Sequence, residues 1–138
     1  PGIYTSGSTI DISGDVTLDA GGNANALFIF QAGSALNVAA GGVSPSNTRI
    51  LLIGSAKASN VWWQVGSTAT IGTYSEFQGS VLAAVNITMG TGATACGRLL
   101  AGAWAGSGGA GVATFGDNIV SVPGQTFVPP AGYSAVCQ

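Results

Sequence analysis

The chain has 138 residues, enough for one domain with a hydrophobic core, and it carries a net charge of −2 with only 6% charged side chains. So little positive charge argues against binding nucleic acid or an anionic membrane surface, because no basic patch could neutralise a row of phosphates. A hydrophobic content of 46% argues against charge-driven disorder, and no apolar run approaches the roughly 18–20 residues of a membrane-inserted helix.

Short stretches of alternating apolar and polar residues follow one another along the whole chain. Gly, Ser and Asn clusters separate them, and almost no segment is long enough for a helix of three turns. The stretches are rich in β-branched and aromatic residues, which is typical of strands. In chain order we expect strands at 8–13, 16–19, 27–31, 35–39, 49–54, 61–66, 68–72, 80–83, 85–90, 98–102 and 118–122. The chain is therefore predicted to be all-β.

Internal repeats choose among the all-β architectures. Two units recur at one and the same interval: TIGT at 70–73 with TMGT at 88–91, and GSVLA at 79–83 with GRLLA at 97–101. A third match, QAGSALNV with QVGSTATI, has a longer interval, from Gln31 to Gln64. A fixed period indicates stacked coils, so residues 1–138 are predicted to form one β-solenoid domain rather than a sandwich or barrel. We interpret the shorter interval as one coil and the longer interval as two coils with altered corners.

The alternation within each coil assigns side chains to the interior or to the surface. Apolar positions of successive coils should fill the core, and the polar positions between them should form an outward ladder at about the 4.7–4.9 Å separation of paired strands. The expected interior side chains are Phe30, Val38, Ile71, Met89 and Leu99. The expected ladder stacks Thr70 on Thr88 and Thr68 on Asn86, with Ala35 and Asn37 one longer interval earlier in the chain.

Recognisable catalytic and metal-binding patterns are missing from the sequence. The chain contains no His, which removes the usual general base and the usual metal ligand. Asp11, Asp15 and Asp19 are interpreted as solvated turn carboxylates rather than a calcium site, because Gly14 interrupts the strand between them. The glycine-rich stretch at 102–111 lacks the Lys-Ser/Thr pair of a phosphate-binding loop. We expect no enzyme activity, no cofactor and no metal.

Cys96 and Cys137 fit neither a redox motif nor a zinc cluster. They form either one disulfide that ties the C-terminal tail to the body or two buried free thiols. Low charge and many small polar residues favour an oxidising, extracellular setting, and we expect a secreted protein. The chain begins at Pro1 without an initiator Met or a signal peptide, so we expect that a segment upstream was removed or omitted.

Three stretches together resemble the microbial ice-binding (antifreeze) protein family, whose members come from cold-adapted organisms. They are PGIY…ISGDVTLDAGGNANALFIFQAG at 1–33, NVWWQVGSTATIGTYSEFQGSVLA at 60–83 and ITMGTGATACGRLLAG at 87–102. Residues 1–102 are similar to the C-terminal two-thirds of that family, and 103–138 diverge. The resemblance implies a discontinuous right-handed β-helix of roughly triangular section. It also implies a long helix along one side, for which this chain has no segment.

The resemblance further implies that ice is the partner. In that family, one flat side bearing Thr, Ser, Ala and Asn binds ice, and some members carry a T-A/G-x-T/N motif, which TGAT at 91–94 matches. The implied function is adsorption to ice that inhibits its growth or recrystallisation. The residues expected to bind ice are Asn37, Thr68, Thr70, Asn86, Thr88, Thr91 and Thr94.

A second hypothesis is an extracellular structural, adhesive or filament-forming module, because the open ends of a solenoid present unpaired strand edges. The stretches LFIFQ at 27–31 and VWWQVG at 61–66 are apolar on nearly every residue, as in strands buried on both faces. We therefore expect their outer side to be covered by an N-terminal segment, another protein, or a second copy in an oligomer or filament.

Overall fold

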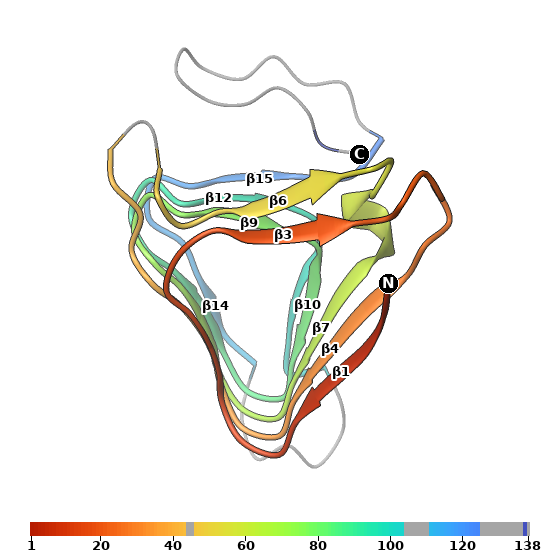
Figure 1. The fold of residues 1–138 in the computed structure, drawn as a ribbon. Coiled ribbons are helices and arrows are strands. Elements are labelled where there is room, and N and C mark those ends of the chain that lie inside the picture. The colour runs from red at the N-terminus through yellow and green to blue at the C-terminus, as the bar shows by residue number, and fades with distance from the viewer. Residues whose placement is uncertain (44–45, 104–110, 125–136, 138) are drawn as a thin grey trace.

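A computed structural model describes residues 1–43, 46–103, 111–124 and 137. Short parallel strands wind into a solenoid whose three sides enclose a triangular section (Figure 1). In that view the chain passes down one side, up the second and across the third. It runs clockwise while it recedes from the viewer, which makes the solenoid right-handed. The predicted all-β solenoid of triangular section is confirmed.

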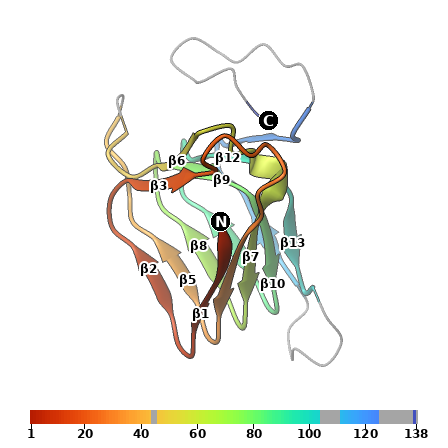
Figure 2. The ribbon, with the colours of Figure 1, turned by 45° about the vertical axis from the view of Figure 1, so that its right-hand side comes forward.

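Each side of the triangle collects one strand from each successive coil. Side A has the strand order β1-β4-β7-β10-β13, and side B has the order β2-β5-β8-β11-β14. Side C contains the pair β3-β6 and the sheet β9-β12-β15, which a bridge between Arg49 and Glu76 connects. Figure 2 turns side A forward beside side B.

The strands have the following bounds, coil by coil. Coil one contains β1 (Gly2–Ser6), β2 (Ile10–Ile12) and β3 (Val16–Asp19); coil two contains β4 (Phe28–Ala32), β5 (Leu36–Val38) and β6 (Ile50–Ile53). Coil three contains β7 (Val61–Val65), β8 (Ala69–Ile71) and β9 (Glu76–Gln78); coil four contains β10 (Ser80–Ala83), β11 (Ile87–Met89) and β12 (Thr94–Cys96). Coil five contains β13 (Leu99–Ala101), β14 (Ala113–Thr114) and β15 (Ile119–Ser121).

Helical structure in the described residues is limited to one 3-10 turn, Ala58–Asn60, before β7. No helix there is long and apolar enough to span a membrane.

The register of the strands explains both sequence intervals. Thr70 pairs with Thr88, and Arg98 N donates to Ser80 Oγ across the same offset of 18 residues, so the shorter interval is one coil, as predicted. Gln31 pairs directly with Gln64, so the longer interval, 33 residues, is also one coil, and the prediction of two coils is wrong. Coil two is longer because it has extra residues at two of its corners, one between β5 and β6 and the other between β6 and β7. Corner insertions change the spacing along the chain without changing which strands pair.

Four strands were absent from the sequence prediction: β1, β9, β12 and β14. Three of them have only two or three residues, too few for an alternating pattern to stand out. β9 and β12 each present a single side chain to the core, Phe77 and Ala95, and these two residues lie side by side in neighbouring coils. Pairing with the coils above and below therefore sets these strands, more than their own composition does.

Apolar side chains from all three sides fill the interior. The predicted interior residues Val38, Ile71 and Met89 are buried, and Phe30 and Leu99 pack against the same core. An aromatic row crosses the first three coils, with ring centroids 5.0 Å apart for Tyr4 and Phe30 and 4.1 Å apart for Phe30 and Trp63. The buried indole of Trp63 donates its Nε1–H to the carbonyl of Gln78 at 3.0 Å, which satisfies its one polar group.

The glycine of the GxxLA repeat lies at the corner where side C turns into side A. Gly79 has φ +109°, and a Cβ there would lie 2.7 Å from Cγ1 of Val61 and 2.8 Å from Nε1 of Trp63. A Cβ on Gly97 would overlap the carbonyl of Gly79 in the coil before it. The repeat therefore recurs because the short corners from β9 to β10 and from β12 to β13 each need a residue without a side chain.

Candidate functional site

Side B carries one exposed polar residue per coil, at the centre of β2, β5, β8 and β11 and at the end of β14. These residues are neighbours across the parallel pairs, and in coils one to four both residues flanking each of them pack in the core. We call this row the central ladder; it consists of Asp11, Asn37, Thr70, Thr88 and Thr114. The predicted stacking of Thr70 on Thr88 is the register that the structure has, and Asn37 is in the same ladder, one coil before Thr70 instead of the two coils predicted.

A second row runs parallel to the central ladder, two residues earlier in each coil. Backbone hydrogen bonds keep it in register: Leu36 N donates to Thr68 O at 3.1 Å, and Ala69 N donates to Asn86 O at 2.9 Å. This flanking row consists of Thr9, Ala35, Thr68, Asn86 and Val112. Because the strands of side B hold the two rows at fixed spacing, the surface presents a regular two-dimensional array.

Small residues border the central ladder on its other side. The position two residues after each rung is Ser13, Ala39, Gly72, Gly90 or Gly116. Nothing larger than a hydroxymethyl group therefore rises beside the threonines there, and side B is flat from the flanking row to this border.

The two ends of the central ladder differ in chemistry. In coils one and two, Asn37 Nδ2 donates to Asp11 Oδ1 at 2.9 Å, so a carboxylate and an amide bind each other there. In coils three to five, the rungs Thr70, Thr88 and Thr114 each present one methyl and one hydroxyl group. Asp11 is the one charged residue in the ladder.

The remaining predicted site residues fall in three different environments. Thr68 lies in the flanking row, partly buried. Asn86 lies beside it, but its Oδ1 accepts a hydrogen bond from Val112 N at 3.0 Å, so its amide also holds coil five to coil four. Thr91 is exposed in the turn after β11. Thr94 belongs to β12 on side C, between Glu76 and Ile119, so the TGAT segment turns a corner and Thr94 is not on side B.

Sequence reasoning missed two members of the central ladder, Asp11 and Thr114. Thr114 could have been found, because TFG at 114–116 repeats the Thr-x-Gly pattern that begins at Thr70 and Thr88. The larger spacing to this third copy, 26 residues instead of 18, concealed it. In the sequence, Asp11 stands out only as part of an acidic run.

That acidic run is divided between two sides of the solenoid. Asp11 lies on side B, whereas Asp19 on side C accepts a hydrogen bond from Gly21 N at 2.8 Å, as a turn carboxylate does. Asp15 pairs with Arg49, whose Nε and terminal nitrogen both reach the carboxylate, at 3.1 Å and 2.6 Å. No cluster of three or more His, Cys, Asp or Glu side chains that could hold a metal occurs among the described residues.

The Asp15–Arg49 pair dominates the local electrostatics of side C. The hydrogen bond from Arg49 lowers the pKa of Asp15, and the hydrogen bond to Asp15 raises the pKa of Arg49. Both side chains are about one-third exposed, so water screens their attraction and the pair is expected to add little stability. Its charges lie on a different side from the central ladder.

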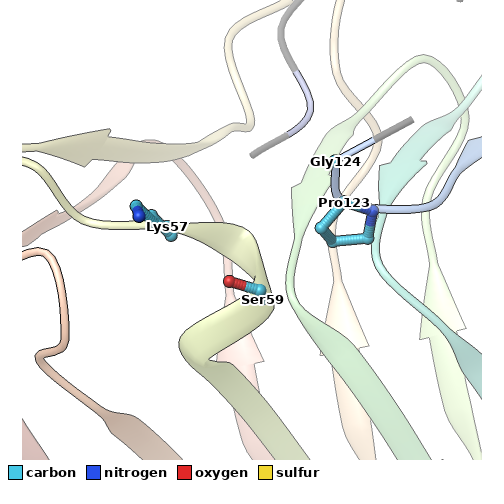
Figure 3. A pocket seen from close by; sticks show the side chains of 4 residues that line it. All are labelled: Lys57, Ser59, Pro123 and Gly124. Carbon is cyan, nitrogen blue, oxygen red and sulfur yellow. The ribbon is translucent and has the colours of Figure 1, made fainter. Parts of the chain in front are cut away.

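A shallow, open hollow lies between the 3-10 turn and the segment after β15 (Figure 3). Lys57, Ser59, Pro123 and Gly124 line it. These four residues provide one ammonium group and one hydroxyl, with neither a base beside the hydroxyl nor an acidic partner for the ammonium. They do not form the nucleophile and base pair that covalent catalysis requires.

The outer surface of side A is largely apolar. Ile3 is 68% exposed and Leu27 is 51% exposed, and the outward side chains of Ile29, Trp62 and Leu82 are partly exposed beside them. One polar row crosses this surface: Thr5 donates to Gln31 Oε1 at 3.1 Å, and Gln31 Nε2 donates to Gln64 Oε1 at 2.9 Å.

Known proteins share this fold and much of this sequence. The Ice-binding-like family model matches residues 1–105. The chain is 44% identical over 102 residues to an ice-binding protein from Nostoc sp. (strain HG1), covering 73% of this chain and 35% of that protein. It is 37% identical over 101 residues to an ice-binding protein from Flavobacterium frigoris (strain PS1), covering 73% of this chain and 34% of that protein.

A solved structure shows the same likeness in three dimensions. The crystal structure of an ice-binding protein from the Antarctic ascomycete Antarctomyces psychrotrophicus superposes with a TM-score of 0.76 at 34% identity. The match covers 89% of this chain and 54% of that protein. The chain therefore spans about a third of the length of the curated relatives it matches and about half of this solved structure.

Proposed function

Because the chain belongs to the Ice-binding-like family, we propose that it adsorbs to ice through side B. The observation that carries this proposal is the row of exposed threonines Thr70, Thr88 and Thr114, one per coil on a flat strand surface. The proposed contact residues also include Asn37, Thr68, Asn86 and Thr91 from the same side or its corner. Thr94 is left out because it lies on side C.

The chemistry of the ladder suits a surface of ordered water. Paired strands repeat every 4.7–4.9 Å or so, and each threonine adds a hydroxyl that donates and accepts hydrogen bonds beside a methyl group that does neither. In coils one to four, core residues on either side of each rung hold the array rigid, so adsorption orders few new protein groups there. No bond is made or broken in such a process, and we propose a non-catalytic protein that inhibits ice growth or recrystallisation.

Ice-affinity partitioning of three matched variants tests the proposed surface. Thr70→Tyr and Thr88→Tyr place a bulky ring in the array and are expected to abolish retention in ice. Thr17→Tyr makes the same change at an exposed position on side C and should be retained like the parent. All three should keep their melting temperature, because exposed substitutions usually change stability by less than about 0.5 kcal/mol.

The proposed surface would be overturned if both side B variants partitioned into ice as the parent does. Equal loss of retention in Thr17→Tyr would also count against side B. It would show that a tyrosine ring reduces retention in ice wherever it is placed on the surface.

We also propose that the outside of side A is covered by an N-terminal segment, by another protein, or by a second copy in an oligomer or filament. Support comes from the exposed apolar side chains Ile3, Leu27 and Leu100, since large apolar patches rarely stay in contact with water. This surface is also the feature that would suit the alternative, a self-assembling structural module. Size-exclusion chromatography beside ice partitioning separates the two: a monomer retained in ice supports ice binding, and a polymer excluded from ice supports the alternative.

An extracellular location completes the proposal. Cys96 and Cys137 are joined by a disulfide, and disulfides persist mainly in oxidising compartments.

A further inference from the structure

Coil five is the least buried part of the described solenoid. Its strands pair on one side only, with β10, β11 and β12 of coil four. None of the described residues between Arg98 and Gly124 is fully buried. Leu100, Phe115 and Val120 are 45%, 50% and 42% exposed. Segments with few buried apolar contacts open at a lower free energy than the core does, so coil five should be the first to separate.

One covalent bond brackets this coil. Cys96 ends β12 in coil four, opposite Ser121 of β15, and its Sγ is bonded to that of Cys137. Cys137 lies beyond coil five, where its carbonyl accepts a hydrogen bond from Gly124 N at 3.2 Å. The bonded cysteines are 41 residues apart, and all three strands of coil five lie between them. The disulfide therefore holds the far edge of the last coil against the coil before it.

The other attachments of coil five are hydrogen bonds. Besides the strand pairs, Asn86 Oδ1 accepts from Val112 N at 3.0 Å, and Asn118 Nδ2 donates to Gly90 O at 2.7 Å and to Ala93 O at 3.0 Å. Each such bond adds little net stability, because water forms an equivalent bond when the coil opens.

We propose that the Cys96–Cys137 disulfide is a redox-sensitive clamp on coil five. Reduction frees the last coil, and with it the rung Thr114, while coils one to four stay folded on their own buried core. The consequence for ice rests on the proposed function, because only then does a ladder shortened by one rung weaken adsorption. The opening itself does not depend on that function.

The reducing step is thiol–disulfide exchange with a dithiol. A thiolate of the reductant attacks Sγ of Cys137, the more exposed of the two residues, and the thiolate of Cys96 leaves and takes up a proton. The second thiol of the reductant then displaces Cys137. Two electrons pass to the protein, both cysteines end as thiols, and the reductant ends as its own disulfide.

Hydrogen–deuterium exchange with the full 138-residue chain tests the clamp. We compare the oxidised protein, the protein reduced by dithiothreitol and the variant Cys137→Ala, and intact mass confirms the redox state of each. Amides of β13, β14 and β15 should exchange faster by roughly a hundredfold in the reduced protein and in the variant, the factor expected from a typical native disulfide. Amides of β4, β7 and β8 should not change. Dithiothreitol should have no further effect on Cys137→Ala, which controls for other actions of the reductant.

Two results would overturn the proposal. Unchanged protection of coil five after complete reduction would show that hydrogen bonds alone hold it. Loss of protection in all coils would show that the disulfide supports the whole fold rather than the last coil. Ice partitioning of the same samples is read separately: an oxidised protein that does not bind ice contradicts the proposed function, and the exchange result still decides the clamp.

Discussion

At the scale of single residues, adjacent residues of one strand differ in burial, because one side chain points into the core and the next points outward. Trp63 is buried in the aromatic row and donates to Gln78, whereas Trp62 points outward on side A and is partly exposed. Thr70 and Ile71 divide in the same way on side B, one exposed and one buried. A sequence alone predicts such divisions well, because the period of two is local.

Because the period of two is local, it could not predict placements that depend on a corner or on residues far apart in the sequence. Thr94 follows Thr91 by three positions and looks like its partner, but the corner between them places the two on different sides. The hydrogen bond from Val112 N to Asn86 Oδ1 joins residues that are 26 positions apart in the sequence. Only the three-dimensional register brings them together.

A matched pair of substitutions tests the division at Thr70 and Ile71. Ile71→Asp would place an unpaired carboxylate in the core and should cost more than about 4 kcal/mol, enough to unfold many domains of this size. Thr70→Asp adds the same charge one residue away, in water, and should keep nearly the parent melting temperature. Circular dichroism on heating measures both. Equal melting of the two variants would show that the inward and outward assignment is wrong.

At the scale of elements, the corners determine the fold as much as the strands do. Strands of three residues such as β9 and β12 have little preference of their own, and neighbouring coils align them. The turn that precedes them or follows them must therefore place them in the correct register. This is why β9 and β12 escaped prediction, while the glycines at the corners that follow them recur in the sequence.

Substitutions at two glycines test the importance of the corner between sides C and A. Gly97→Ala would push a methyl group into the carbonyl of Gly79, and crowding of this kind typically costs about 1–3 kcal/mol. Gly14→Ala adds the same methyl group where no atom lies within 4 Å, so its stability should be close to that of the parent. Chemical denaturation measures the difference. A Gly97→Ala variant as stable as Gly14→Ala would mean that the corner can relax.

At the scale of the whole molecule, the solenoid architecture was predictable from the sequence, but the number of residues in each coil was not. The interval shared by the two short repeats indicated stacked coils, and residues 62–97 do form two of them with that spacing on all three sides. The longer interval looked like a multiple of the period because extra residues at a corner leave no mark in the strand pattern. The apolar runs 27–31 and 61–66 do place apolar side chains on both faces of side A, with Gln31 and Gln64 as the polar exceptions on the outer face.

Trp62 reports on whether side A is covered. Subtracting the fluorescence spectrum of Trp62→Phe from that of the parent isolates the emission of Trp62, because Trp63 and Trp104 contribute to both spectra. In a dilute monomer of these 138 residues, that difference signal should be red-shifted and open to quenching by acrylamide, because the ring is partly exposed on side A. It should become protected in an oligomer or in a longer chain. A dilute monomer in which the Trp62 signal is fully protected would contradict an uncovered side A.

The unequal lengths of the coils have a consequence for how such a protein can change. Pairing between neighbouring strands sets the register of the coils, whereas the number of residues per coil varies at the corners. Residues added at a corner therefore leave the stacked array intact. The two coils formed by 62–79 and 80–97 are the exception, because they are equal in length and carry no extra chain at any corner. Each of them is a minimal cassette that supplies one strand to every side, one glycine to the tight corner and one threonine to the central ladder. Tandem duplication of such a cassette would lengthen the array by one rung in a single genetic event, whereas point substitutions could only alter rungs already present.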